Sequence, residues 1–270
     1  MTRSHAHHGP RESHKLLFQD EFSGSAGAAP NASKWEPVTG GDGWGNQELE
    51  YYTGRSSNVA LDGAGHLAIT ARRETYTGSD GVTRYYTSAR LQTKGLFQST
   101  YGVLEARIKI PNGMGLWPAF WALGSNIEHV GWPAAGEIDM MENLGHDPFT
   151  VYGSIHGPQA GSPDDYAVGA TMRSPVSLAA GFHIYGVRWS PNKMIFTFDG
   201  TAYATRTPAS LQPGQRWVFN KPFFLLLNLA VGGTWPGYPN SSTRFPATLW
   251  VDWVRVHSGC RSACNARSAR

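Results

Sequence analysis

Residues 104–110 read Leu-Glu-Ala-Arg-Ile-Lys-Ile, an unbroken alternation of apolar and charged side chains. Successive side chains of a β-strand point to opposite faces, so the apolar members share one face and the charged members share the other. This alternation is typical of a strand that covers a core on one side and meets water on the other. We therefore predict a half-buried β-strand here.

The same period of two recurs later in the chain. Lys193–Asp199 alternates in this way, and the pair Asp199-Gly200 is a hairpin turn signal. His183–Trp189 and Leu249–His257 alternate with aromatics on both faces, as strands between two packed sheets would. Phe223–Leu227 is a short apolar run that fits a buried strand.

Helical patterns are almost absent. Ala209–Leu211 could form one turn, and 32 Gly and 17 Pro punctuate the chain too often for long helices. Many short strands at close spacing predict an all-β protein built as an antiparallel β-sandwich.

The composition indicates one large domain. The chain has 270 residues, of which 40% are hydrophobic, enough for one full core. Residues 1–15 and 257–270 hold six of the 23 basic residues and one of the 20 acidic residues, so the body carries 17 basic against 19 acidic side chains. No basic stripe points to nucleic acid, and we expect no such partner.

We expect three segments: a disordered or tag-like arm at 1–14, one β-sandwich domain at 15–257 and a basic tail at 258–270. The tail holds Cys260 and Cys264, which are too few for a zinc site and leave a local disulfide or free thiols open.

No apolar stretch approaches the roughly 20 residues that span a bilayer, so we expect no membrane partner. No signal peptide is present, and a secreted protein without its signal would read this way.

Three carboxylates lie within one short apolar run, Glu137-Ile138-Asp139-Met140-Met141-Glu142. Burying acids beside Ile and Met is costly unless they are paired or functional. In a strand, Glu137 and Asp139 share a face, whereas Glu142, five positions on, would face the other way. One bulged residue in the pair Met140-Met141 would bring Glu142 back beside the others. Such an arrangement suits acid–base and nucleophilic work on a glycosidic bond.

This run and four other segments, in the same order, resemble glycoside hydrolase family 16 in its bulged, bacterial laminarinase-like form. The other segments are 43–52 (GWGNQELEYY), 88–90 (SAR), 117–121 (WPAFW) and 227–233 (LNLAVGG). The resemblance extends from about Leu16 to Val256. It implies a jelly-roll β-sandwich with a concave substrate cleft, so that 15–257 would be the catalytic domain.

The resemblance also implies an activity, that of a retaining endo-β-1,3-glucanase acting on laminarin-type β-glucans and also on mixed β-1,3/1,4-glucans. Glu137 would be the nucleophile, Glu142 the general acid and then the base, and Asp139 would hold or tune Glu137. Retention needs the two working carboxyls about 5–5.5 Å apart. A third carboxylate raises a neighbour's pKa, which helps the acid to stay protonated.

Four tryptophans are candidates for substrate binding. Trp117 and Trp121 are four residues apart on an expected strand and share a face near the acids. Trp132 and Trp235, like Trp44, lie in Gly/Pro-rich loops, where a ring is hard to bury and can serve as a sugar platform. The others are expected to pack in the core or on the outer face: Trp35, Trp189, Trp217, Trp250 and Trp253.

Three polar residues complete the candidate substrate set. Asn46 and Arg90 match family positions that hydrogen-bond glucose hydroxyls, for which the rigid fork of Arg is well suited. For Asn46 a structural hydrogen bond to a loop is the alternative. His156 follows the acid run by an expected hairpin, from where it could donate to a substrate hydroxyl or to Asp139, or serve only as a structural residue.

A structural Ca²⁺ is implied by the resemblance alone. The matching positions are Glu21, Gly65 and Asp252, where backbone carbonyls and one carboxylate would suit an oxygen-preferring cation.

We expect no organic cofactor, a β-glucan as the partner, and a monomer.

Two other classes compete with the leading hypothesis. A hydrolase of the same fold for another polysaccharide, if sulfated, would favour several Lys or Arg near the acids, and only Arg90 is found there. A non-catalytic β-glucan recognition protein typically lacks the paired glutamates, and both Glu137 and Glu142 are present. The sequence therefore favours an enzyme.

Overall fold

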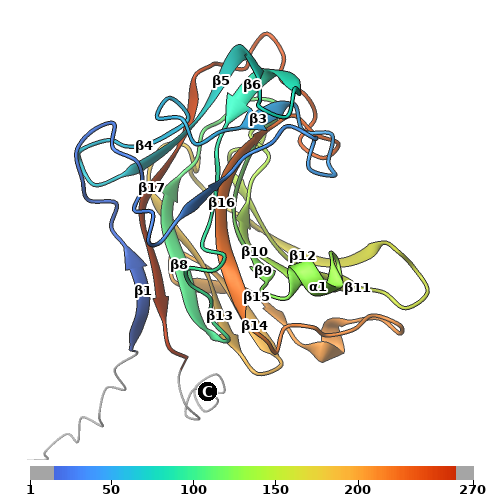
Figure 1. Cartoon of the computed structure of the whole chain (residues 1–270). Coiled ribbons are helices and arrows are strands. Elements are labelled where there is room, and N and C mark those ends of the chain that lie inside the picture. Colours follow the sequence, from blue (N-terminus) through green and yellow to red (C-terminus); the bar gives the residue numbers. More distant parts are fainter. Residues whose placement is uncertain (1–14, 260–270) are drawn as a thin grey trace, which may run out of the picture.

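Two twisted β-sheets packed face to face form the protein in the computed structural model, which describes residues 15–259 (Figure 1). The predicted antiparallel β-sandwich is therefore confirmed. The arm expected at 1–14 and the pair Cys260 and Cys264 lie outside the described residues.

The larger sheet has ten strands within residues 15–259, and its main path runs β15-β14-β13-β8-β17-β5-β6-β3. β1 pairs with β17 and β4 with β5, and every pairing is antiparallel except the parallel one between β3 and β6. Figure 1 shows β1 and β17 side by side although they lie at opposite ends of the sequence. The strands are β1 (Leu16–Asp20), β3 (Glu50–Tyr52), β4 (Val59–Leu61), β5 (Leu67–Thr77), β6 (Thr83–Ser88), β8 (Gly102–Lys109), β13 (His183–Ser190), β14 (Lys193–Phe198), β15 (Thr201–Arg206) and β17 (Ala247–His257).

The smaller sheet has seven strands within the same range, in the order β12-β11-β10-β9-β16-β7-β2. All of its pairings are antiparallel. Its strands are β2 (Glu36–Val38), β7 (Arg90–Gln92), β9 (Leu116–Gly124), β10 (Glu137–Glu142), β11 (Thr150–Pro158), β12 (Asp165–Arg173) and β16 (Phe223–Val231).

The alternating residues 104–110 lie in β8 and at the residue that follows it. Leu104, Ala106 and Ile108 are at most 1% exposed, whereas the charged residues between them are half-buried on the outer face. The predicted hairpin is also present, because β14 and β15 are joined at Asp199 and Gly200. Both residues have positive φ, 46° and 76°, the conformation that an Asp-Gly turn supplies.

The core fills the space between the two sheets. All nine residues of β16 are buried, which agrees with the apolar run that predicted this strand. Trp35 and Trp189 are core residues at 1% exposure, and Trp253 is also buried. Trp217 and Trp250 are half-buried outside the cleft, so none of these five lines it.

Helix is confined to two short pieces in the described part of the chain. The 3₁₀ turn η1 (Pro208–Ser210) falls where one turn was predicted, and the four-residue α1 (Ile127–Val130) was not predicted. No helix among the described residues has the length and apolarity to cross a membrane.

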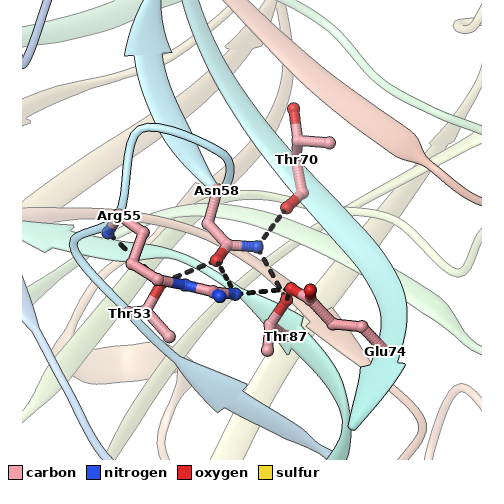
Figure 2. Close-up of polar contacts among 6 residues, drawn as sticks. All are labelled: Thr53, Arg55, Asn58, Thr70, Glu74 and Thr87. Carbon is pink, nitrogen blue, oxygen red and sulfur yellow. Dashed lines mark hydrogen bonds and ion pairs between the residues drawn. The ribbon is translucent and has the colours of Figure 1, made fainter. Parts of the chain in front are cut away.

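A buried polar network ties the loop after β3 to β5 and β6 (Figure 2). Asn58 donates to the Thr70 carbonyl at 3.0 Å and to the Thr87 hydroxyl at 2.9 Å, and its own carbonyl oxygen accepts from the Thr53 hydroxyl at 2.6 Å. Arg55 also donates to Asn58 and forms an ion pair with Glu74. Because its polar atoms are paired, the network can be buried at the end of the sheet from which the cleft loop 42–48 emerges.

Candidate active site

A cleft of about 950 Å³ crosses the outer, concave face of the smaller sheet. Alternate residues of neighbouring strands point into it, because successive side chains of a strand face opposite ways. The loop around Trp44 and Asn46 and the exposed rings of Trp132 and Trp235 form its rim. The strand residues that line it include Arg90 of β7, Trp117, Ala119 and Trp121 of β9, Tyr152, Ser154 and His156 of β11, Asp165 and Ala167 of β12, and Asn228 and Ala230 of β16.

The predicted bulge lies in β10. The register shifts between Asp139 and Glu142 on the β11 side and between Asp139 and Met141 on the β9 side. Met140 and Met141 are both fully buried in the core. As a result Glu137, Asp139 and Glu142 all line the cleft, although Glu137 and Glu142 are five residues apart.

Each of the two glutamates accepts a hydrogen bond from an indole. Trp132 Nε1 donates to Glu137 Oε2 at 3.0 Å, and Trp117 Nε1 donates to Glu142 Oε1 at 3.0 Å. Within residues 15–259 these are the only protein hydrogen bonds to the two carboxyl groups. The second oxygen of each carboxyl group therefore accepts no hydrogen bond from the described residues.

Asp139 and His156 form a charged cluster beside Glu137. The Ser154 hydroxyl donates to Asp139 Oδ2 at 2.7 Å, and His156 Nε2 lies 3.2 Å from the same oxygen. The other ring nitrogen of His156, Nδ1, lies 2.5 Å from Asp165 Oδ2. Polar atoms of Glu137, Asp139 and His156 all lie within 4.8 Å of one another, so these groups feel each other's charge strongly.

Burial sets the protonation of the acids. Desolvation, followed by repulsion from Asp139, raises the pKa of Glu137 to about 8. The same two causes raise the pKa of Glu142 well above its usual range. The imidazolium of His156 and the Arg90 guanidinium both favour the ionised form of Glu137. His156 acts on both glutamates, but Arg90 also favours ionised Glu137, and Glu137 in turn raises the pKa of Glu142, so Glu137 is suited to ionise and Glu142 to keep its proton.

His156 is held in its charged form. Burial alone would lower the pKa of the imidazole, but hydrogen bonds to Asp139 and Asp165 outweigh it and raise that pKa to about 11. Glu137, Asp139 and His156 are close enough to offer three ligand atoms to a metal ion. A metal needs the neutral imidazole, however, so the cluster is better suited to organising protons than to holding a cation.

The tryptophan predictions are matched by position. Trp117, Trp121, Trp132 and Trp235 all line the cleft. The ring of Trp235 meets that of Trp117 edge-on at a centroid distance of 5.5 Å and is 42% exposed, so a flat apolar surface is available at this end. Trp121 Nε1 donates to Asn228 Oδ1 at 2.7 Å, which fixes the ring on the cleft floor.

Arg90 is clamped between two of the rings. Its guanidinium carbon lies 4.7 Å from the ring centre of Trp44 and 4.7 Å from that of Trp121. Its Nε is buried and has no partner among the described residues. Burial lowers the pKa of Arg90, but the group remains a cation. Its unused donor fits the predicted role in binding hydroxyls.

The loop that carries Trp44 and Asn46 has an unusual backbone. Gly43 and Gly45 have φ of 84° and 78°, and Trp44 and Gln47 also have positive φ, 52° and 59°. Non-glycine residues pay for this conformation, and such strain clusters at functional sites. Asn46 Nδ2 donates to Glu48 at 3.0 Å, so the structural hydrogen bond considered for Asn46 exists, although the residue also lines the cleft.

The sequence analysis did not single out five polar or aromatic residues of the site: Glu48, Tyr152, Ser154, Asp165 and Asn228. Asn228 had a detectable signal, because it is the one polar residue inside the apolar run of β16. Glu48 lies in a quoted motif but was not singled out. Asp165 had no signal, because its role depends on the pairing of β12 with β11, which brings it to His156.

The positions expected to bind calcium lie on the larger sheet and beside it. A Cβ added at Gly65 would lie 4.0 Å from the Glu21 carbonyl oxygen, so these two backbone segments approach each other. The Asp252 carboxylate forms an ion pair with Arg107, and the Glu21 side chain pairs with Arg255. To bind a cation here, the Asp252 carboxylate would have to leave Arg107. Calcium stays a prediction.

The fold and the cleft together define a class, a β-sandwich polysaccharide hydrolase with paired catalytic carboxyls. A family model described as "Glycosyl hydrolases family 16" matches residues 45–255. The chain therefore belongs to glycoside hydrolase family 16, as its motifs indicated.

Individual relatives agree with this membership. A beta-glucanase of Rhodothermus marinus is 39% identical over 90% of this chain and 85% of its own length. The solved endo-β-1,3-glucanase of Pyrococcus furiosus is 46% identical, with a TM-score of 0.82 over 90% of this chain and 94% of that one. The laminarinase catalytic domain of Thermotoga maritima is 41% identical, with a TM-score of 0.84 over 93% of this chain and 100% of that one.

Proposed function

We propose that the protein is a retaining endo-β-1,3-glucanase that cleaves laminarin-type β-glucans inside the chain. The observation that carries the proposal is the pair Glu137 and Glu142, both held in the cleft by indole hydrogen bonds and both raised in pKa, with Asp139 between them. The relatives named above are laminarinases and β-glucanases, which supports the choice of polymer.

In the first step the Glu137 carboxylate attacks the anomeric carbon of the glucosyl unit. Glu142 donates its proton to the glycosidic oxygen as the bond from that oxygen to the anomeric carbon breaks, so the leaving chain departs as an alcohol. The product is a glycosyl ester on Glu137. This assignment follows the surroundings of the two acids, since Arg90 and His156 both favour ionised Glu137, whereas the pKa of Glu142 is raised by Glu137 as well as by Asp139.

In the second step Glu142, now a carboxylate, takes a proton from water. The water oxygen attacks the anomeric carbon, the ester bond breaks, and Glu137 is released as a carboxylate. Because two displacements occur at one carbon, the configuration is retained. His156 and Asp139 organise charge throughout: the imidazolium favours ionised Glu137, and Asp139 holds both His156 and Ser154.

An internal attack on the polymer is supported by the extent of the cleft. Its lining runs from Arg90 of β7 across the sheet to Ala167 of β12, which is wider than one sugar ring needs. The rings of Trp121 and Trp235 offer flat apolar surface on the way. The proposal extends to action outside the cell, since a polymeric substrate cannot cross a membrane, and to the structural calcium at Glu21, Gly65 and Asp252.

The test is reducing-sugar release from laminarin, mixed-linkage β-glucan and carboxymethylcellulose, with Glu137→Ala and Glu142→Ala beside the wild type. We expect release from laminarin and its loss in both variants. An exposed acid on β2 supplies the control variant, Glu36→Gln, which should behave as wild type. Faster release from mixed-linkage glucan would move the substrate to that polymer, and laminarin binding without release would identify a recognition protein.

Azide separates the two glutamate roles when an activated aryl glycoside is the substrate. In Glu137→Ala, azide would replace the missing nucleophile and give the α-glycosyl azide. In Glu142→Ala, the ester on Glu137 still forms, and azide would give the β-glycosyl azide. The opposite pair of products would reverse the assignment.

A further inference from the structure

A second pair of carboxyl groups lies in the cleft wall, away from the three acids of β10. Glu48 and Glu50 are two residues apart at the start of β3, so their side chains share a face with Tyr52. Glu48 lines the cleft and is 6% exposed, and Glu50 behind it is fully buried. The mechanism above uses neither residue.

Both oxygens of Glu48 already have donors. Oε1 accepts from Asn46 Nδ2 at 3.0 Å, and Oε2 accepts from the Tyr52 hydroxyl at 3.0 Å. That hydroxyl in turn accepts from Asn228 Nδ2 at 3.1 Å, so its proton points to Glu48. Because both oxygens of Glu48 face donors, the group has only acceptor sites to offer to a further neighbour.

Glu50 is short of a donor. Its Oε2 accepts from the Val231 backbone N–H at 2.6 Å, but its buried Oε1 has no donor among the described residues. The Glu48 carboxylate lies within hydrogen-bonding reach, and it can only accept. Two bare carboxylates would repel each other in this buried place, whereas one proton between them makes a charge-assisted hydrogen bond.

Arg90 brings a positive charge near the pair, but it forms no ion pair with Glu48 or Glu50. The titratable and charged groups that face Glu50 are Glu48 and Tyr52 on its own segment and Arg90 on β7. Arg90 makes no ion pair in the described part of the chain, and its charge is spread between the rings of Trp44 and Trp121. Burial, and then the charge of Glu48, raise the pKa of Glu50 well above its usual range.

We propose that Glu50 is a neutral carboxylic acid that donates its proton to Glu48, and that this acid pair holds the Asn46 amide in position at the cleft wall. With its Nδ2 bound to Glu48, Asn46 presents Oδ1 as an acceptor for a sugar hydroxyl. Glu48 and Glu50 are therefore positioning residues. The role of Asn46 in binding a sugar rests on the proposed function. The sharing of a proton between Glu48 and Glu50 does not depend on it.

The shared proton is tested by unfolding Glu50→Gln and wild type in urea between pH 5 and pH 8. Glutamine keeps a donor for Glu48 and an acceptor for Val231 but cannot ionise. Unfolded wild type ionises Glu50 above its ordinary pKa while the folded state keeps it neutral, so wild type loses stability as pH rises. The unfolding constant of wild type relative to Glu50→Gln should grow about tenfold per pH unit.

Glu36→Gln is the matched control, because it makes the same substitution at an exposed glutamate on β2. Its difference from wild type should stay constant with pH. A constant difference for Glu50→Gln as well would show that Glu50 is ionised in the folded state and would overturn the proposal, whichever of the two proteins is the more stable.

The positioning of Asn46 is tested by a double-mutant cycle with Glu48→Gln and Asn46→Ala on laminarin. In Glu48→Gln an amide NH₂ replaces one of the two oxygens that face the donors of Asn46 and Tyr52, so a donor meets a donor. KM should therefore rise about tenfold, and kcat should fall much less. If Glu48 acts through Asn46, adding Glu48→Gln to Asn46→Ala should raise KM less than twofold further. Fully additive losses would overturn this role. The urea result stands even if laminarin is not the substrate, so the two failures can be told apart.

Discussion

Glu137 and His156 are direct cross-strand partners in the β10–β11 ladder. The backbone register alone therefore places an imidazole beside the nucleophile, and Asp139 and Asp165 keep that imidazole charged. The cation lowers the cost of ionising Glu137 in a buried place, and it acts on Glu142 as well, although Glu142 pairs with Tyr152 in the ladder. Arg90 is a second cation that favours ionised Glu137, and this helps to separate the roles of two chemically identical side chains.

Asp165→Asn should weaken catalysis most at high pH. The hydrogen bond to Asp165 helps to raise the pKa of His156 to about 11, so its loss lets the imidazole discharge at lower pH and leaves Glu137 harder to ionise. We expect kcat/KM to be little changed near pH 6 and to fall at the alkaline end of the profile, by about tenfold for each pH unit above the lowered pKa of His156. Asp164→Asn, at the exposed neighbouring residue, is the control. A loss that does not vary with pH would contradict the charge role.

Asp139→Asn should move the whole pH–rate profile to lower pH. Repulsion from Asp139 raises the pKa of both Glu137 and Glu142, so removing its charge lowers both values. Glu137 then ionises at lower pH, which extends activity on the acid side, and Glu142 loses its proton earlier, which cuts activity on the alkaline side. We expect both limbs of kcat/KM to shift by about one pH unit. An unmoved profile with a lower rate would assign Asp139 a purely structural role.

Trp235→Ala should weaken substrate binding without a comparable loss in kcat. The ring is 42% exposed and makes edge contacts with Trp117 and Tyr152, so its outer face is free for a sugar. Loss of about 1–2 kcal/mol of stacking would raise KM roughly 5- to 30-fold. Tyr85→Ala, which removes a 69% exposed ring on β6, should leave KM unchanged. Equal effects of the two variants would contradict a platform at Trp235.

Calcium should stabilise the protein if the predicted site binds it. We expect millimolar CaCl₂ added after chelation to raise Tm by a few degrees, because a ligand that binds only the folded state shifts unfolding by mass action. In Asp252→Asn the increment should vanish, since the carboxylate that would leave Arg107 for the ion is gone. If added calcium leaves the Tm of the wild type unchanged, the predicted site does not bind the ion.

Asn58→Ala should destabilise the fold but spare the cleft. Asn58 pairs with Thr53, Thr70 and Thr87 in the network of Figure 2, and its removal leaves one donor, the Thr53 hydroxyl, and two acceptors, the Thr70 carbonyl and the Thr87 hydroxyl, without these partners. We expect the free energy of unfolding to fall by about 2–4 kcal/mol. KM for laminarin, measured well below Tm, should stay as in wild type. A raised KM would show that the network also positions the loop at 42–48.

Local patterns in the sequence determined most of the fold and the identity of the acids. The alternation at 104–110, the Asp199-Gly200 turn and the apolar run of β16 each encode their structure within a few neighbouring residues, because side-chain direction in a strand has period two. The carboxylates of Glu137–Glu142 were visible for the same reason: acids among apolar residues break the pattern. The bulge was inferred from their spacing, and the structure has it at that place.

The tertiary structure decided which distant residues meet. Asp165 reaches His156 only because β12 pairs with β11, and Arg90 is clamped between Trp44 and Trp121 only because β7 and the loop at 42–48 reach the same end of the cleft. Glu50 is fully buried and accepts from the Val231 N–H of β16, a strand of the other sheet. Strand order and burial depend on the whole chain, so the protonation of these groups, which depends on burial and on neighbours from other strands, could not be read from any local pattern.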